Sequence, residues 1–473
     1  MNWLTALPEI VLSILGMLIL VYGVLRKPDQ TQVCTMMTLG AFLVTGFLLV
    51  TRAGGIGYHG QFTVDAFSIF CKALILVGAA LALMLALDYN QQQKIERFEY
   101  PVLMLFAVVG MMGMVSATNL MTLYLSLELQ SLALYVMAAF ARDELRSSEA
   151  GLKYFVLGAL ASGLLLYGIS LVYGFSGTMD FRVLERALTA PGSVSPGVIV
   201  GIVFMIAGLA FKASVAPFHM WTPDVYEGAP TSVTAFLATA PKVAAMALFL
   251  RTMVQPFGHL LPSWQLILEI ISICSMVLGA LAAIGQFNIK RLMAYSSIGH
   301  MGYALIGLVV GTPAGIRGLL VYLIVYIFMS AGVWACIISM RRRGMALEKI
   351  EDLSGLGRTD PALALALTVF MFSMAGIPPL SGFFGKLYVF LAAVQAHLWA
   401  LVVIGVLSSV VASYYYMRIV KVMYFDKPVA AFDRKMTATT FVATVTGLFT
   451  LLFFLFPGPL VSAAGTAAAS LFG

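Results

Sequence analysis

Residues 208–230 read GLAFKASVAPFHMWTPDVYEGAP, and residues 372–390 read FSMAGIPPLSGFFGKLYVF. Each stretch is an apolar run that contains a lysine and is interrupted by prolines and glycines. Proline removes a backbone donor and frees a carbonyl one turn earlier, so each stretch predicts a broken helix. Broken helices at matching positions of two halves of a chain are the best sequence indicator of a transport site in a membrane protein.

The rest of the chain is similarly apolar. Hydrophobic residues make up 61% of the 473 positions, charged residues only 10%, and the mean hydropathy is +0.97. These values lie outside the range of soluble domains, so the sequence predicts an all-α polytopic membrane protein. Residues 1–25 lack a basic segment and a small-residue cleavage pattern, so we expect a first span there and not a removed signal peptide.

Apolar runs of roughly 20 residues, the length of one membrane crossing, predict about fourteen spans. Their centres lie near residues 14, 42, 80, 109, 132, 163, 205, 243, 274, 302, 328, 377, 411 and 449.

Basic residues fall mainly on alternate connections between these spans, which marks the cytoplasmic side. An even number of spans then places both termini on the outer, periplasmic side of a bacterial inner membrane. The basic connections contain Arg26 and Lys27; Lys94 and Arg97; Arg142 and Arg146; Lys290 and Arg291; Arg341, Arg342, Arg343, Lys349 and Arg358; and Lys427, Arg434 and Lys435.

The two predicted broken helices are the seventh and twelfth spans. A unit of five spans crosses the membrane an odd number of times, so a second copy runs in the opposite sense, as in an inverted repeat. We therefore predict three N-terminal spans, two inverted five-helix repeats that each contain a broken helix, and a C-terminal span. Their bounds are residues 1–97, 98–256, 262–425 and 426–473.

Four ionisable residues interrupt apolar runs: Glu128, Lys212, Lys242 and Lys386. An ionised group near the middle of a membrane costs at least about 2.5 to 3.5 kcal/mol, so such positions are usually functional. A buried amine holds its proton less firmly, and a nearby carboxylate restores it. At an effective dielectric constant near 20, two unit charges about 6 Å apart interact by roughly 3 kcal/mol, so a small movement could switch the amine.

These residue types suggest proton movement. We predict that Glu128 modulates Lys212, that Lys242 relays protons at the centre of the bundle, and that Lys386 passes them outward. The structural alternatives are that Glu128 belongs to a purely structural buried ion pair, and that Lys212 and Lys386 bond the carbonyls freed at the helix breaks. Lys72, near the end of a span, is expected to be interfacial.

Three further residues are relay candidates. His300 lies in RLMAYSSIGHMGYALIGL, a segment rich in hydroxyl groups, and imidazole relays protons near neutral pH. His219 follows the first break and is equally suited to bonding local backbone. Lys153 lies near a cytoplasmic helix end, where its side chain could simply reach the aqueous surface. Asp224 is expected to cap the helix that follows the break.

Metal, disulfide and nucleotide chemistry lack support in the sequence. The four cysteines are isolated from one another, without the CxxC spacing of zinc or iron–sulfur sites. Residues 55–60, GIGYHG, match GxGxxG, but no strand precedes them and no βαβ pattern surrounds them. We therefore expect no metal and no cofactor in this chain.

Several motifs carry a family resemblance: SLELQSL around Glu128, EAGLKYFVLGA around Lys153, FKASVAPFHMWTPDVYEGAP around Lys212, NIKRLMAYSSIGHMGY around His300 and GIPPLSGFFGKLYVF around Lys386. Together they resemble the antiporter-like proton-pumping subunits of respiratory complex I, and within that family the subunit N group of bacterial NADH:quinone oxidoreductases. A lysine at the last position resembles subunit N, because subunit M has a glutamate there. The chain also ends soon after its fourteenth span, without the long lateral helix of subunit L.

The resemblance implies roles for the same residues: a Glu–Lys pair at Glu128 and Lys212, a central lysine at Lys242, a terminal lysine at Lys386, and Lys153 and His300 as further relays. It also implies a hetero-oligomer in the lipid bilayer, with antiporter-like sibling subunits and small membrane subunits, and no nucleic acid. FMN, iron–sulfur clusters, the NADH site and quinone reduction would belong to partner subunits. The chain would thus be a translocase subunit without a redox centre of its own.

Two other functions remain open at this point. A subunit of a multisubunit cation/proton antiporter would share the fold and the charged motifs. A membrane scaffold would use the buried charges only to fix helix packing.

Overall fold

Helices dominate the computed structural model, which describes residues 3–26, 30–51, 54–189 and 194–472. Within these ranges thirteen helical segments are long and apolar enough to cross a membrane. One more crossing is divided between two shorter helices, α16 and α17. The predicted all-α polytopic fold, with about fourteen crossings of roughly 20 residues each, is confirmed.

The helices of the first half are α1 (Leu7–Leu25), α2 (Thr31–Thr51), α3 (Ala66–Gln92), α4 (Glu99–Ser116), α5 (Leu120–Ala138), α6 (Leu145–Ser176), α7 (Phe181–Thr189), α8 (Pro196–Ala213), α9 (Trp221–Gly228), α10 (Thr231–Leu237) and α11 (Ala240–Val254). Those of the second half are α12 (Leu261–Ile284), α13 (Ile289–Val310), α14 (Pro313–Ile338), α15 (Leu356–Thr359), α16 (Pro361–Ala375), α17 (Ser381–Gln395), α18 (Trp399–Phe425), α19 (Thr437–Leu452) and α20 (Gly458–Ala469). Two small antiparallel hairpins pair β1 (Gly55–Gly57) with β2 (Phe62–Val64), and β3 (Arg341–Arg342) with β4 (Met345–Ala346).

Both predicted helix breaks are present. α8 ends with Ser214 in a left-handed conformation (φ 59°), and α16 ends with Gly376 (φ 91°). The chain then resumes as α9 and as α17. Gly382 permits the second resumption, because a Cβ atom there would lie 1.9 Å from the carbonyl oxygen of Ser373. Each group of five crossings thus contains a broken helix, as predicted.

A third break was not predicted. The eighth apolar run is divided into α10 and α11, and Thr239 between them has a non-helical backbone (φ −117°, ψ −97°). Pro241 lacks the N–H that a continuous helix would need at this place. The Ser330 hydroxyl of α14 instead donates to the Ala238 carbonyl at 3.2 Å. This break brings Lys242 into the first turn of α11.

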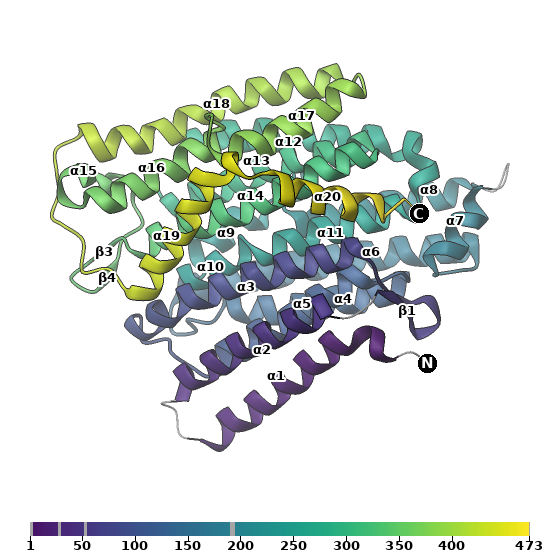
Figure 1. The fold of residues 1–473 in the computed structure, drawn as a ribbon, viewed down its shortest axis with the longest axis horizontal. Coiled ribbons are helices and arrows are strands. Elements are labelled where there is room, and N and C mark those ends of the chain that lie inside the picture. Colours follow the sequence, from purple (N-terminus) through teal and green to yellow (C-terminus); the bar gives the residue numbers. More distant parts are fainter. Residues whose placement is uncertain (1–2, 27–29, 52–53, 190–193, 473) are drawn as a thin grey trace.

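The molecule is an elongated bundle with α1 at one edge and α18 at the opposite edge (Figure 1). The hairpin β3–β4 and α15 mark one end of the bundle, which we call the basic end because Arg341–Arg343 lie there. β1 and α7 mark the opposite end, together with the start of α1 and the end of α20. The Phe67 N–H donates to the Ser470 hydroxyl at 3.0 Å, which ties the end of α20 to the start of α3.

The core of the bundle is formed by α11, α13 and α14. In the most apolar 18-residue window of the α10–α11 run every residue is buried. In the corresponding windows of α13 and α14, 94% of the residues are buried. Polar groups on these helices therefore have to find partners inside the protein. α20 follows the last crossing and packs on α3 and α14, an element beyond the single C-terminal span that the sequence predicted.

Candidate functional site

Glu128 and Lys212 lie at one interface between α5 and α8. Asn119 caps α5 by accepting from two backbone N–H groups, which sets the start of the helix. Lys212, in the last turn of α8, donates to the Ser131 hydroxyl at 2.6 Å and to the Tyr135 hydroxyl at 3.2 Å. Ser131 follows Glu128 by three positions and therefore lies beside it on the same helix face.

The two charged groups are not in direct contact. In the described residues no ion pair within 4.0 Å joins Glu128 to Lys212, and Oε1 of Glu128 is buried without a hydrogen-bond partner. Lys212 instead donates to the hydroxyl of Ser131, which in turn donates to the Leu127 carbonyl at 2.6 Å. The structure thus brings the predicted pair to one interface, where the ammonium bonds hydroxyl groups of α5 and not the carboxylate itself.

Lys242 closes the first helix break. Its Nζ donates to the Ala213 carbonyl, at the end of α8, at 3.4 Å. It also lies 5.4 Å from the ring centre of Trp221 and 5.8 Å from that of Tyr226, both on α9. Bonding to a freed carbonyl was the structural alternative considered for Lys212, but at this break Lys242 makes that bond.

Lys386 closes the second break. Its Nζ donates to the carbonyls of Met374 and Ala375, at 3.1 and 3.0 Å, and to the Ser409 hydroxyl at 2.7 Å. The ammonium also lies 4.9 Å from the ring centre of Tyr303. A cation is favoured here because unpaired carbonyls give the end of a helix a partial negative charge. The bond predicted as the structural alternative is therefore present, and it coexists with a contact to α18.

His300 lies between the two breaks at the centre of a hydroxyl network. Its Nδ1 is 2.7 Å from the Tyr322 hydroxyl and its Nε2 is 3.1 Å from the Tyr416 hydroxyl. Both nitrogens thus have a hydroxyl partner on another helix, Tyr322 on α14 and Tyr416 on α18. Tyr416 also bonds Ser296 at 2.6 Å, and Ser297 bonds Tyr326 at 2.8 Å.

Sequence reasoning found the α13 side of this network but missed its partners. Tyr322 and Tyr326 are four residues apart on α14 and so lie on one face of that helix. A pair of tyrosines at this spacing in an otherwise apolar span was the available signal. Tyr416 is the third of three consecutive tyrosines, and only packing shows which of them are buried: Tyr414 is 59% exposed, whereas Tyr415 and Tyr416 are 2% and 1% exposed.

The buried groups form a lateral series across the bundle. It runs from α5 and α8, through Lys242 and α9, to the His300 network on α13 and α14, and ends at Lys386 on α17. Oε1 of Glu128 and the hydroxyls of Tyr226 and Tyr303 are buried without a protein partner. Such buried polar atoms are ordinarily satisfied by ordered water.

His219 lies in the segment between α8 and α9 and is half-buried. Its Nδ1 is buried and has no hydrogen-bond partner. No side-chain contact within the described residues joins it to the series, so its predicted relay role stays a prediction.

Lys153 belongs to a charged network at the basic end. It pairs with Glu149 at 2.8 Å and with Asp224 at 2.9 Å. Asp224 is also paired with Arg291 at 2.8 Å. The prediction that Asp224 caps α9 is wrong: it is the fourth residue of that helix, and no side chain caps its start at Met220.

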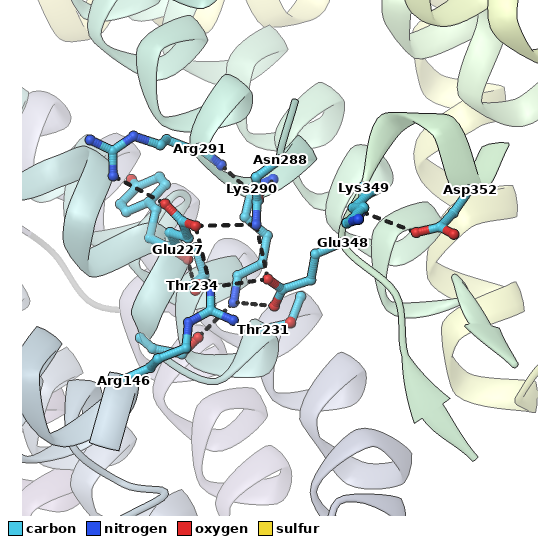
Figure 2. A network of polar contacts seen from close by, with 12 residues as sticks. Arg146, Glu227, Thr231, Thr234, Asn288, Lys290, Arg291, Glu348, Lys349 and Asp352 are labelled. Atoms are coloured by element: carbon cyan, nitrogen blue, oxygen red, sulfur yellow. Dashed lines mark hydrogen bonds and ion pairs between the residues drawn. The ribbon is translucent and has the colours of Figure 1, made fainter. Parts of the chain in front are cut away.

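The centre of this network joins the two halves of the chain (Figure 2). Arg146 of α6 lies 3.3 Å from both Glu227 of α9 and Glu348, which follows the β3–β4 hairpin. Lys290, at the start of α13, pairs with Glu348 at 3.2 Å and donates to the Ala229 carbonyl at 2.8 Å. The basic residues of two predicted cytoplasmic connections therefore share their carboxylate partners.

Glu348 lies outside the spans and is held as a carboxylate. Its partial burial raises its pKa, but Lys290, Asn288 and Arg146 outweigh that effect, so the pKa lies below its ordinary value. The Asn288 amide contributes by donating to Glu348 at 3.0 Å.

A buried ion pair among the N-terminal helices was also missed. Lys72 of α3 is fully buried and pairs with Glu9 of α1 at 2.5 Å, so the prediction that Lys72 is interfacial is wrong. Near it, Arg251 of α11 makes two bonds to Asp65, at 2.7 and 2.8 Å. The sequence could not pair these residues because each partner lies far away along the chain.

As for metal binding, the described ranges contain no group of three or more His, Cys, Asp or Glu side chains arranged to hold an ion. The four cysteines are unpaired thiols.

The transmembrane family described as NADH:quinone oxidoreductase/Mrp antiporter matches residues 117–412, which contain most of the lateral series. The chain belongs to this family. A curated relative, NADH-quinone oxidoreductase subunit N of Granulibacter bethesdensis, is 65% identical over 100% of both chains. The same name is carried by a relative from Gluconacetobacter diazotrophicus, 58% identical over 100% of both chains. The resemblance drawn from the motifs is therefore confirmed.

Solved structures of family members share the fold. A chain of respiratory complex I from Thermus thermophilus with bound Aureothin is 33% identical, with a TM-score of 0.84, and the match covers 97% of this chain and 100% of that one. A chain of the Mrp complex from Dietzia sp. DQ12-45-1b has a TM-score of 0.86 over 100% and 98% of the two chains. Because it is only 22% identical, it shows the fold alone.

Proposed function

We propose that this chain is a membrane-arm subunit of a respiratory NADH:quinone oxidoreductase and carries protons across a bacterial inner membrane. The observation that carries the proposal is the lateral series of buried ionisable and hydroxyl groups from Glu128 to Lys386. Full-length relatives named subunit N favour this function over that of a cation/proton antiporter subunit. NADH oxidation, FMN, the iron–sulfur clusters and quinone reduction would belong to partner subunits, which would include antiporter-like siblings and small membrane subunits.

The geometry supports a mechanism in which local charge shifts move a proton from group to group. Glu128 lies one turn from Ser131, the hydroxyl that Lys212 bonds, so a charge change near α5 alters how firmly that ammonium is held. The next group is Lys242. Its Nζ bonds the carbonyl of Ala213, the residue that follows Lys212 in the chain. At each step the proton passes between polar atoms that are bonded directly or through water.

The helix breaks couple the charge of a lysine to backbone structure. Lys242 and Lys386 are each bound to carbonyls that a continuous helix would satisfy internally. Loss of the proton removes the attraction between the ammonium and the negative helix end, although the neutral amine still donates. The breaks can therefore respond to protonation with a small local movement, which is the kind of response that a switching site requires.

The charged network at the basic end is suited to proton uptake. It lies at the end of α9, next to Tyr226, and at the start of α13, which leads toward His300, and Lys153 is part of its exposed rim. We assign this end to the cytoplasm, because its loops carry the excess of lysine and arginine. Both termini would then lie on the periplasmic side.

We also propose that residues 98–256 and 262–425 are the two inverted repeats. Each contains a broken helix whose freed carbonyls are bound by a lysine. Residues 1–97 and 426–473 would flank the repeats.

The proposal can be tested with Lys212→Ala in the complete complex, reconstituted in proteoliposomes. NADH oxidation and proton translocation are measured together, and Lys349→Ala serves as a control because Lys349 is 71% exposed at the basic end. We expect Lys212→Ala to lower proton translocation and the control to leave it unchanged. Normal values for both activities in a normally assembled Lys212→Ala complex would refute the proposal. They would favour a scaffold whose buried charges only fix packing.

A further inference from the structure

A cavity with several charged lining residues lies at the basic end, away from the lateral series. Its volume is about 400 Å³, and it is enclosed by the ends of α3 and α14, by the β3–β4 hairpin and by the segment before α19. Its lining includes three cationic side chains and one carboxylate: Arg341, Arg434, Lys435 and Asp433. The positive excess predicts an anionic ligand.

The charges differ in how far they are already paired. Lys435 is bound to Asp360 at 2.8 Å. Asp433 accepts the backbone N–H groups of Gly344 and Arg343 at 2.8 and 2.9 Å, and these bonds hold the pKa of its carboxyl below the usual range. The charge of Lys435 is therefore largely neutralised, whereas Asp433 remains an ionised carboxylate whose oxygens are occupied by the hairpin backbone.

The two arginines are not satisfied in this way. Arg341 is 5% exposed, and its Nη2 donates to the Gly344 carbonyl at 2.6 Å. Its Nη1 is buried without a hydrogen-bond partner, which is costly for a charged group. Arg434 is exposed and makes no ion pair with any described residue. The cavity thus offers one buried and one free guanidinium group.

The start of α19 adds backbone donors. Met436 precedes this sixteen-residue helix, and no side chain caps it. The first backbone bond of the helix runs from Thr440 N to Met436 O, so the N–H groups of the first turn are not used within the helix. Unpaired N–H groups at a helix start bind phosphate well, particularly beside arginine.

An apolar surface leads from the cavity along α19. Phe441, Val445, Leu448 and Leu452 are between 38% and 53% exposed, and their spacing places them on one face of the helix. This face begins one turn beyond the polar cavity and continues toward the middle of the bilayer. A ligand with a phosphate group and acyl chains matches both parts, whereas a soluble anion would use only the first.

We propose that an anionic phospholipid binds here, with its phosphate between Arg341, Arg434 and the start of α19 and its acyl chains along the apolar face of α19. Basic pockets between spanning helices on the cytoplasmic side recognise headgroups of this class. The site would anchor the last crossing, and with it α20, against α3 and α14.

The test uses the complete, delipidated complex in detergent, titrated with phosphatidylglycerol in mixed micelles, with bound lipid counted by native mass spectrometry. Arg434→Gln should weaken binding roughly fivefold to tenfold, the size expected for one basic contact to a phosphate. Arg341→Gln should weaken it at least as much. Arg343→Gln, in the same hairpin but outside the cavity lining, is the matched control and should leave binding unchanged.

Three results would overturn the proposal. The first is unchanged phosphatidylglycerol binding in Arg434→Gln, a surface variant expected to fold normally. The second is equal binding of phosphatidylcholine, which has no net negative charge. The third is binding of inorganic phosphate that depends on Arg434 while phosphatidylglycerol does not bind, which would assign the cavity to a soluble anion. Phe441→Asn tests the apolar face of α19 separately from the phosphate site, since it should weaken lipid binding without changing phosphate binding.

Discussion

The hydroxyl of Ser131 is the most informative single atom to remove. It accepts a hydrogen bond from Lys212 at 2.6 Å and donates to the Leu127 carbonyl at 2.6 Å. A hydrogen bond to a charged group contributes about 1.5 to 3 kcal/mol, which corresponds to a factor of roughly 10 to 150 in the preference for the ammonium. Ser131→Ala removes this contribution and changes the volume by only one oxygen atom.

A second effect has a comparable size. Glu128 lies one turn from Ser131, with Cβ atoms about 5–6 Å apart, and its carboxylate favours the charged form of the neighbouring Lys212. At about 6 Å and an effective dielectric constant near 20 that interaction is roughly 3 kcal/mol. The Ser131 hydroxyl can therefore stabilise the Lys212 ammonium as much as the Glu128 carboxylate does. Its removal should disturb the coupling between Glu128 and Lys212.

The assay is proton translocation and NADH oxidation by the complex in proteoliposomes, with assembly checked by size and by subunit content. Ser131→Ala should lower the number of protons translocated per NADH, and Ser131→Thr should restore it because threonine keeps the hydroxyl. Ser126→Ala, on the same helix, is the control, since no bond joins Ser126 to Lys212 in the described residues. Wild-type coupling in a well-assembled Ser131→Ala complex would refute the role assigned to this interface.

Three further predictions follow from contacts elsewhere in the chain. Tyr416→Phe removes a hydroxyl partner from His300 and should lower proton translocation. Tyr414→Phe, at an exposed position nearby, should leave it unchanged. Equal effects of the two variants would contradict the relay role of the network. Lys72→Met leaves the Glu9 carboxylate buried and unpaired, and should lower the free energy of unfolding, measured by thermal unfolding, by about 3 to 5 kcal/mol. Lys72→Met combined with Glu9→Gln should recover much of this loss. A Lys72→Met variant of unchanged stability would rule out a structural ion pair. The pKa of Glu348 is lower in the folded chain than its ordinary value of 4.5, so the stability that it contributes is complete above that pH and is lost as the pH falls through the folded-state value. Glu348→Gln should therefore lower the unfolding temperature at about pH 7, and this loss should shrink as the pH is lowered through the folded-state pKa of Glu348. An equal loss at every pH would contradict the ion pairing.

Local sequence patterns were sufficient for much of the fold. The two helix breaks follow from proline and glycine within apolar runs, because these residues cannot maintain helical hydrogen bonding there. The break before Lys242 was missed, since a lone Pro241 at the start of a helix is well tolerated and gives no clear signal. The short helix α20 was missed because its small residues resemble a tail more than a packed element.

The candidate site was predictable only in part. A buried lysine or glutamate can be recognised from its apolar neighbours in the chain, and Glu128, Lys212, Lys242 and Lys386 were found in this way. Which carbonyl a lysine binds depends on how helices pack, so the sequence could not show that Lys242, and not Lys212, binds the carbonyl freed at the first break.

The sequence by itself determined that the chain crosses a membrane many times, where its helices break and which residue types carry the chemistry, because hydropathy and proline act over a few neighbouring positions. Only the tertiary structure decided that Lys212 bonds Ser131, one turn from Glu128, that Tyr322 and Tyr416 hold His300, and that the charges of the basic end pair across the two halves. Ser131 and Lys212 are 81 positions apart, and His300 is 22 positions from Tyr322 and 116 from Tyr416. These contacts depend on how the helices pack, and no local pattern records which face of one helix meets which face of another.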